Sequence, residues 1–155
     1  LLCGASVFDD EAVDLCVDCG ADFVKLACRE WSNEPLMKKC LDSKLPILKS
    51  YDWGDRVFHF SYEVLMLACI PSYPIFSPRI PIPDIGTMWG WSSHLGNEDS
   101  LDCLLAVFNG ACLVERHIAL SQNDYEQGWS IDANGFTRLV NNIRRIEVMR
   151  NDSRE

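Results

Sequence analysis

The chain has 155 residues, of which 48% are hydrophobic and 24% charged, and its formal net charge at pH 7 is −9. This length suffices for one domain with a buried core, and the negative charge argues against a nucleic-acid backbone as the main partner. No apolar run approaches the roughly 18 residues of a membrane-spanning helix. We therefore expect neither a nucleic acid nor a membrane as a partner.

The first third of the chain alternates apolar runs with amphipathic stretches. Leu1–Ala5 predicts a strand. The helical spacing of Val13, Cys16 and Val17 predicts a helix that begins after Asp9 or Asp10 and stops at Gly20. Three further elements follow, and they are a strand at 23–26, a helix at 34–43 with Pro35 at an early position, and a strand at 46–50.

The same alternation continues after an interruption. Residues 64–69 and 88–91 predict strands, 98–110 an amphipathic helix, 112–115 a strand, and 136–149 the last helix. Two connections break the pattern. Residues 51–63 show no helical face, and residues 73–87 contain four prolines, which excludes a regular helix there.

Apolar strands that alternate with amphipathic helices are typical of parallel strands joined by crossovers. Two α/β architectures fit, an open doubly wound sheet and part of a (β/α)8 barrel. No glycine-rich phosphate loop follows the first strand, which weighs against a dinucleotide-binding fold. In a barrel, functional residues follow the strand ends, and polar residues stand there in this chain, namely Ser6, Lys25 with Glu30, Ser50, Tyr73, His94 and His117.

Eight cysteines is a high number for this length. Cys16 and Cys19 form one CxxC pair, but a second pair, which a cysteine-rich zinc site would need, is absent. Most cysteines lie in apolar segments. We therefore interpret them as buried free thiols and expect a cytoplasmic protein.

Two histidines are candidates for a shared site. His94 follows a short apolar run in 90-GWSSH-94, and His117 ends the next strand in 112-CLVERH-117. Consecutive parallel strands are neighbours, so both imidazoles would reach the same end of the sheet and could bind one metal ion. Buried structural histidines remain the alternative explanation.

The sequence resembles the sialic acid synthase (N-acetylneuraminate synthase) family, in colinear order over nearly the whole chain. The matching stretches are 5-ASVFDDEAVD-14, 22-DFVKLACREWSNEPLMKK-39, 46-PILKS-50, 69-CIPSYP-74, 90-GWSSH-94, 106-AVFNGACLVERHIAL-120 and 129-WSIDANGFTRLVNNIRRIE-147. The resemblance implies the C-terminal part of a TIM-type barrel, roughly strands 4–8, over residues 1–150, with a tail at 151–155.

The resemblance also implies an activity and its ligands. The family condenses phosphoenolpyruvate with N-acetylmannosamine or its 6-phosphate to give N-acetylneuraminic acid or its 9-phosphate, and the full-length protein is expected to be a homodimer. His94 and His117 match the residues that bind a divalent metal, Mn²⁺ or Mg²⁺. The other matches are phosphoenolpyruvate-binding Lys25, Ser50 and Ser6, proton-transferring Glu30, and sugar-binding Tyr73 and Glu126.

Several positions depart from the family pattern. Cys28 stands where the family has a phosphate-contacting serine, Arg29 replaces a small residue, and Tyr51 replaces a threonine. The first strands of the family barrel, with a glutamate and a lysine of the site, have no counterpart. The alternative to an enzyme is therefore a truncated, degenerate paralogue that binds a metal or a protein partner without catalysis.

Overall fold

The structure, a computed structural model, describes residues 1–54, 64–75, 90–96, 100–121 and 123–152. The chain divides into two compact units, Leu1–Leu67 and Ala68–Glu155. The strands follow the order β1-β2-β3-β4 in the first unit and β4-β5-β6 in the second, and the boundary falls inside β4. This strand order equals the chain order, as in a barrel built from successive β/α units.

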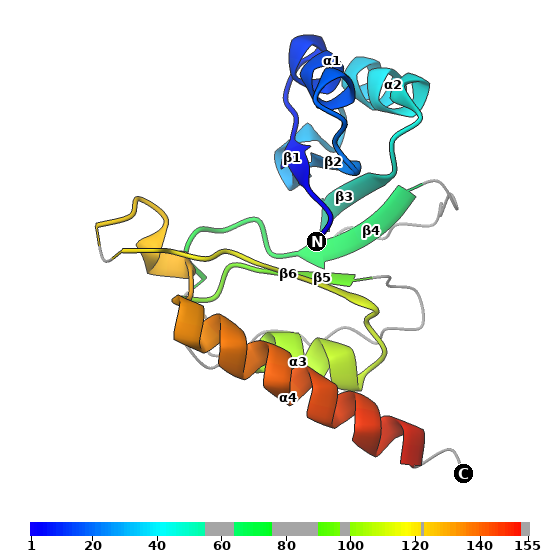
Figure 1. The fold of residues 1–155 in the computed structure, drawn as a ribbon. Helices are drawn as coiled ribbons and strands as arrows, with labels where there is room; N and C mark the ends of the chain where they lie inside the picture. Colours follow the sequence, from blue (N-terminus) through cyan, green and yellow to red (C-terminus); the bar gives the residue numbers. More distant parts are fainter. Residues whose placement is uncertain (55–63, 76–89, 97–99, 122, 153–155) are drawn as a thin grey trace. The chain divides into compact units, whose positions relative to one another are not determined.

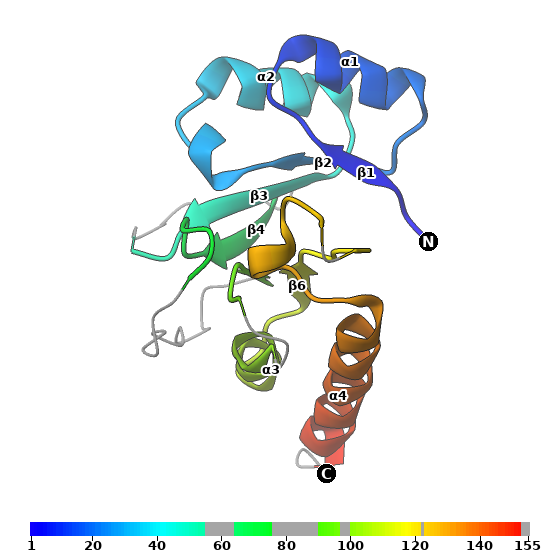
Figure 2. The same cartoon turned by 90° about the vertical axis from the view of Figure 1, so that its left-hand side faces the viewer.

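The first unit places two helices over a parallel sheet (Figure 1). Its elements are β1 (Gly4–Ser6), α1 (Asp10–Asp18), β2 (Phe23–Leu26), the 3₁₀ turn η1 (Cys28–Glu30), α2 (Glu34–Ser43) and β3 (Ile47–Asp52). Val24 and Leu26 of β2 are completely buried, and Figure 2 shows α1 and α2 side by side on one face of these strands. The side chain between them, Lys25, therefore points to the opposite face.

The second unit has parallel strands and two packed helices. Its elements are β4 (Val64–Cys69), β5 (Gly90–Ser93), α3 (Leu101–Phe108), β6 (Leu113–Arg116), the 3₁₀ turn η2 (Gln127–Trp129) and α4 (Ala133–Asp152). Trp91 of β5 and Cys103 of α3 are almost fully buried, and the Trp91 indole N–H donates to Asp102 Oδ2 at 2.7 Å. This bond fixes α3 to β5 three residues before His94.

Side-chain caps fix the starts of three helices. Asp9 Oδ1 accepts from the Ala12 amide at 2.8 Å, as expected, and Asn33 Oδ1 accepts from the Leu36 amide at 3.2 Å. Asp132 Oδ1 accepts from the Gly135 amide at 2.6 Å. This last cap explains why α4 begins at Ala133, three residues before the start expected from its apolar face.

The same turn ends α1 and α3. Gly20 follows α1 with φ of 70°, and Gly110 follows α3 with φ of 117°, a region that favours glycine. Ala21 N donates to Cys16 O and Ala111 N to Ala106 O, both at 2.9 Å. With the Gly20–Val17 and Gly110–Val107 bonds, each turn is a Schellman motif that leads directly into the next strand.

The expected elements are present, with shifted ends. The strand expected at 88–91 is β5, and the described part of it runs from Gly90 to Ser93. The two irregular connections, 51–63 and 73–87, lie mostly outside the described residues. No helix in the described part of the chain is long and apolar enough to cross a membrane.

Candidate metal centre

The two histidines lie side by side at the ends of neighbouring strands. β5 and β6 pair in parallel, with Ser93 opposite Arg116, so the next residue of each strand is a histidine. The ring centroids of His94 and His117 are 5.4 Å apart. The expectation that both imidazoles reach one place is confirmed.

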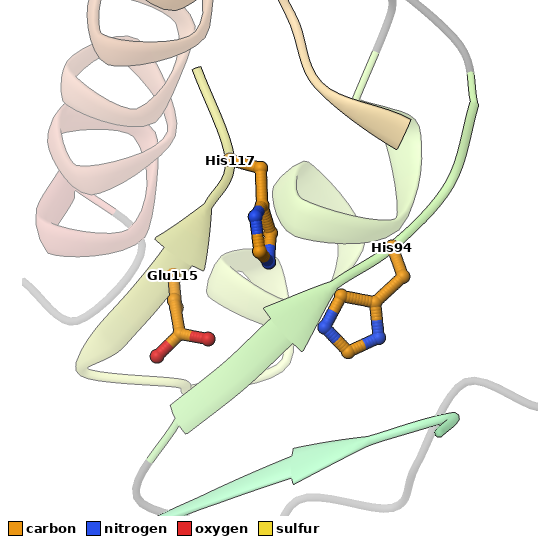
Figure 3. Close-up of side chains that lie close together, drawn as sticks. All are labelled: His94, Glu115 and His117. Carbon is orange, nitrogen blue, oxygen red and sulfur yellow. The ribbon is translucent and has the colours of Figure 1, made fainter. Parts of the chain in front are cut away.

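A carboxylate that we did not predict as a ligand joins them. Glu115 lies two residues before His117, and residues at this spacing on a strand share a face. Ligand atoms of His94, Glu115 and His117 all lie within 4.8 Å of one another. Figure 3 shows the three side chains gathered at the ends of β5 and β6. The Glu-x-His spacing on a strand was the available signal.

Each of the three side chains has a partner that orients it. His94 Nδ1 lies 2.9 Å from the Ile70 carbonyl oxygen, and His117 Nδ1 lies 2.7 Å from Glu126 Oε2. Because a carbonyl or carboxylate oxygen accepts, each Nδ1 is the donor in these contacts, and Nε2 is the nitrogen of a neutral imidazole that could bind a cation.

Ser92 Oγ in turn donates to Glu115 Oε1 at 2.7 Å. Metal-binding histidines typically donate their other ring N–H to a carboxylate or a backbone carbonyl. The arrangement around His94, Glu115 and His117 therefore fits a bound divalent cation.

Glu126 and Tyr73, predicted as sugar contacts, both border this centre. Glu126 contacts His117, and its side chain is 46% exposed. The Tyr73 ring lies 4.0 Å from the His94 ring and 5.6 Å from the Trp129 ring, and Tyr73 is half exposed. Their positions are compatible with a sugar beside the metal, and their sugar contacts stay predictions.

The predicted phosphoenolpyruvate-binding residues share one face of the first unit. Ser6 pairs with Lys25 in register, and Lys25 pairs with Leu48. Ser50 lies two residues beyond Leu48, so it points to the same side as Lys25 and Ser6. We call these three residues the anion group.

Two members of the anion group, Lys25 and Ser50, are buried, whereas Ser6 is exposed. The Ser50 hydroxyl has no hydrogen-bond partner among the described residues. A buried hydroxyl without a partner is uncommon in folded proteins, and this one lies on the same face as a buried ammonium.

A second buried lysine of the same sheet faces the other way. Lys49 pairs with Leu26, so it lies on the face covered by α1 and α2. Its ammonium donates to the Trp31 carbonyl at 3.1 Å and lies 4.5 Å from the centre of the Trp31 ring. Burial lowers the pKa of Lys49. Lys49 is thus tied to η1 and is excluded from the anion group.

Glu30, the predicted proton-transferring residue, ends η1. Its carboxylate accepts from Asn33 Nδ2 at 2.9 Å and lies 3.6 Å from Arg29 Nε. The exposed Arg29 side chain stacks over Phe8, with the guanidinium carbon 4.2 Å from the ring centre. Glu30 is thereby held beside a positive charge, and its role in proton transfer remains a prediction.

Comparison with known proteins identifies the family. The sequence profile of the NeuB family matches residues 58–155, which is more than half of the chain and includes the whole metal centre. The chain belongs to the NeuB family. The sequence is also 26% identical, over an alignment of 166 residues, to the N,N'-diacetyllegionaminic acid synthase of Legionella pneumophila. That match covers 92% of this NeuB-family chain and 46% of the relative, so the chain spans about half the length of the curated relatives that it matches.

Solved structures show the same fold. The N-acetylneuraminic acid (sialic acid) synthetase of Leptospira borgpetersenii matches with a TM-score of 0.83 at 21% identity, over 96% of this chain and 58% of that one. The spore coat polysaccharide biosynthesis protein spsE of Bacillus subtilis matches with a TM-score of 0.78 at 20% identity, over 96% and 47%. The expected fold, an α/β partial barrel, is confirmed.

Proposed function

We propose that this NeuB-family chain carries part of the site of a sugar-acid synthase that condenses phosphoenolpyruvate with an N-acetylmannosamine-type sugar. The observation that carries the proposal is the convergence of His94, Glu115 and His117 within 4.8 Å, each with an orienting partner. The named relatives, a legionaminic acid synthase and a sialic acid synthetase, support the reaction class.

The donor set favours Mn²⁺ over Mg²⁺ as the cation. Two imidazole nitrogens and one carboxylate oxygen suit Mn²⁺, whereas Mg²⁺ is usually held by oxygen ligands and water. A cation bound here would supply Lewis-acid polarisation of the sugar's carbonyl oxygen. Ile70 O, Glu126 and Ser92 keep the ligands in orientation before the cation or the substrate arrives.

The anion group supplies the binding chemistry for phosphoenolpyruvate. The Lys25 ammonium offers positive charge, and the Ser6 and Ser50 hydroxyls offer neutral donors on the same face. An anionic oxygen would satisfy the buried Ser50 hydroxyl, which has no partner in the described structure. Glu30 is the carboxylate that we assign to proton transfer, and Tyr73 and Glu126 are the residues that we assign to the sugar.

The direct test is a condensation assay on the natural full-length protein with phosphoenolpyruvate, N-acetylmannosamine and Mn²⁺. We expect release of inorganic phosphate together with a 3-deoxy sugar acid detected by mass spectrometry. His117→Gln should abolish the reaction, because it removes a metal ligand. Lys38→Met, at a lysine whose side chain is 81% exposed, is the control and should leave the rate unchanged.

The second candidate is a metal-binding paralogue without catalysis. It is favoured by Cys28, which stands where the family pattern has a phosphate-contacting serine and lies in η1, the turn that also carries Glu30. A chain that binds Mn²⁺ through His94 and His117 but gives no product with either the free or the 6-phosphorylated sugar supports this candidate. A chain that binds no Mn²⁺ contradicts both.

A further inference from the structure

Arg116 lies between Glu115 and His117 but points to the other face of β6. Its guanidinium approaches Asp102 and Cys103 of α3 closely enough to interact electrostatically with both. Burial lowers the pKa of Arg116, and these two groups of α3 partly oppose that effect. A buried charge is costly unless hydrogen bonds satisfy it, so the partners of this guanidinium indicate what it does.

The acceptors of Arg116 surround His94. Arg116 Nη2 donates to the Leu95 carbonyl at 2.6 Å, and Nη1 donates to the Ser93 carbonyl at 3.3 Å and to Ser93 Oγ at 3.2 Å. Ser93 and Leu95 are the two neighbours of His94 in the chain. The backbone on both sides of this ligand is therefore bonded to one rigid, planar group.

The same guanidinium also reaches the segment that orients His117. Arg116 Nη1 donates to the Trp129 carbonyl at 3.1 Å. The Trp129 amide donates to the Glu126 carbonyl at 3.1 Å, and the Glu126 carboxylate holds His117 Nδ1. One side chain thus connects the backbone around His94 with the η2 turn, which directly follows Glu126, the partner of His117.

We propose that Arg116 is a positioning residue of the metal centre, whose guanidinium sets the separation and orientation of His94 and His117. This inference rests on the proposed function, because it requires that the two imidazoles share a cation. Arg116 offers no ligand atom to the cation, because its side chain leaves the opposite face of β6 from Glu115. It acts through the backbone of residues 93–95 and through the η2 turn.

The geometry makes arginine hard to replace. The planar fork serves carbonyls of Ser93, Leu95 and Trp129 at once, in fixed directions. A lysine ammonium keeps the charge but has three donors on a flexible stem, and it cannot reproduce that fork. We therefore expect Arg116→Lys to fold and to bind the cation less well, and Arg116→Gln to bind it still less.

The test measures Mn²⁺ affinity by the paramagnetic resonance signal of free Mn²⁺ in titrations of the whole chain. Loss of an outer hydrogen-bond partner of a metal ligand typically weakens binding by about 10- to 100-fold. We expect a loss of about tenfold for Arg116→Lys and about 100-fold for Arg116→Gln. The visible absorption spectrum of bound Co²⁺ should also change, because it reports the ligand geometry and not the fold.

Arg150→Gln is the matched control. Arg150 Nη1 also donates to a backbone carbonyl of the second unit, that of Val107, at 2.8 Å, but away from the metal centre. It should leave the Mn²⁺ affinity and the Co²⁺ spectrum unchanged. Equal losses for Arg116→Gln and Arg150→Gln would overturn the inference, because they would indicate general loosening of the unit.

The remaining outcomes distinguish a failure of the positioning role of Arg116 from a failure of the proposed function. Wild-type affinity and an unchanged Co²⁺ spectrum in Arg116→Lys overturn the positioning role and leave the proposed function intact. Absence of Mn²⁺ binding by the unsubstituted chain overturns both. If Arg116→Gln does not fold, the Arg116→Lys comparison still decides.

Discussion

The metal centre of the second unit and the anion group of the first unit are built in different ways. At the metal centre, Ile70 O, Glu126 and Ser92 hold the three ligands in place. In the anion group, the Ser50 hydroxyl is buried and has no partner among the described residues. The first site is oriented in advance, whereas the second keeps an unsatisfied donor that an anionic ligand could complete. The difference suggests that the two ligands bind by separable interactions.

The largest effect is expected at the carboxylate of the metal centre. Glu115→Gln keeps the shape of the side chain but removes the negative charge from the set of three ligands, and we expect Mn²⁺ affinity to fall by about 100-fold. Isothermal titration calorimetry measures the change. Glu147→Gln, at an exposed carboxylate paired with Arg144, is the control and should bind normally. Unchanged Mn²⁺ affinity in Glu115→Gln would show that Glu115 is not a ligand and that only the two histidines bind the cation.

The next effect separates the two sites. Lys25→Met removes the ammonium of the anion group, and a hydrogen bond to a charged group contributes about 1.5–3 kcal/mol. We expect phosphoenolpyruvate affinity, measured by calorimetry, to fall by at least tenfold while Mn²⁺ affinity stays constant. Lys38→Met, at a lysine whose side chain is 81% exposed, should change neither. A parallel loss of Mn²⁺ affinity in Lys25→Met would show that the two sites are not separable.

Two buried serines should respond to the same substitution with opposite signs. Ser50→Ala removes an unsatisfied hydroxyl, and we expect the free energy of unfolding to rise by about 1 kcal/mol. Ser92→Ala removes the donor to Glu115 at 2.7 Å, and we expect a fall of about 1.5–3 kcal/mol. Urea unfolding without ligands measures both. A destabilised Ser50→Ala variant would mean that this hydroxyl has a partner in solution.

The smallest effect is a dependence of stability on pH. Burial raises the pKa of the Cys40 thiol in the first unit and of the Cys103 thiol in the second above the ordinary value of 9.0. The folded state therefore keeps both protons where the unfolded chain loses them, so this stabilisation is complete below about pH 9 and declines as pH rises.

Urea unfolding between pH 7 and 10.5 measures this decline. Both cysteines are completely buried, and the increase in pKa is larger for Cys103, where the nearby Asp102 adds to the effect of burial. Cys103→Ala should therefore flatten the alkaline decline more than Cys40→Ala does. The opposite order would show that the thiol of the first unit is the better shielded one.

The sequence predicted the elements and the two histidines because both leave local patterns. Apolar runs marked the strands, and His94 and His117 each directly follow a strand. Glu115 was missed although its spacing from His117 is also a local pattern, whereas the role of Arg116 leaves no such pattern. Glu115 owes its place to alternation on β6, and the partners of Arg116 include backbone carbonyls at Ser93, Leu95 and Trp129, which carry no signature in sequence.

Element ends were predicted least well for a similar reason. The start of α4 depends on the Asp132 cap and not on the apolar face that revealed the helix. The partner of His117 was also unpredictable as such. Glu126 had been assigned to the sugar, and only the folded turn brings its carboxylate to 2.7 Å from Nδ1.

The paired Schellman motifs after α1 and α3 have a consequence for engineering. Gly20 and Gly110 close the same hydrogen-bond pattern in the two units and deliver the chain into β2 and β6 through turns of equal length. Two turns with the same length and the same hydrogen-bond pattern should be able to replace each other. Exchanging the segments 19–22 and 109–112 should therefore preserve folding. These turns are suitable crossover points for recombining β/α modules of different barrels.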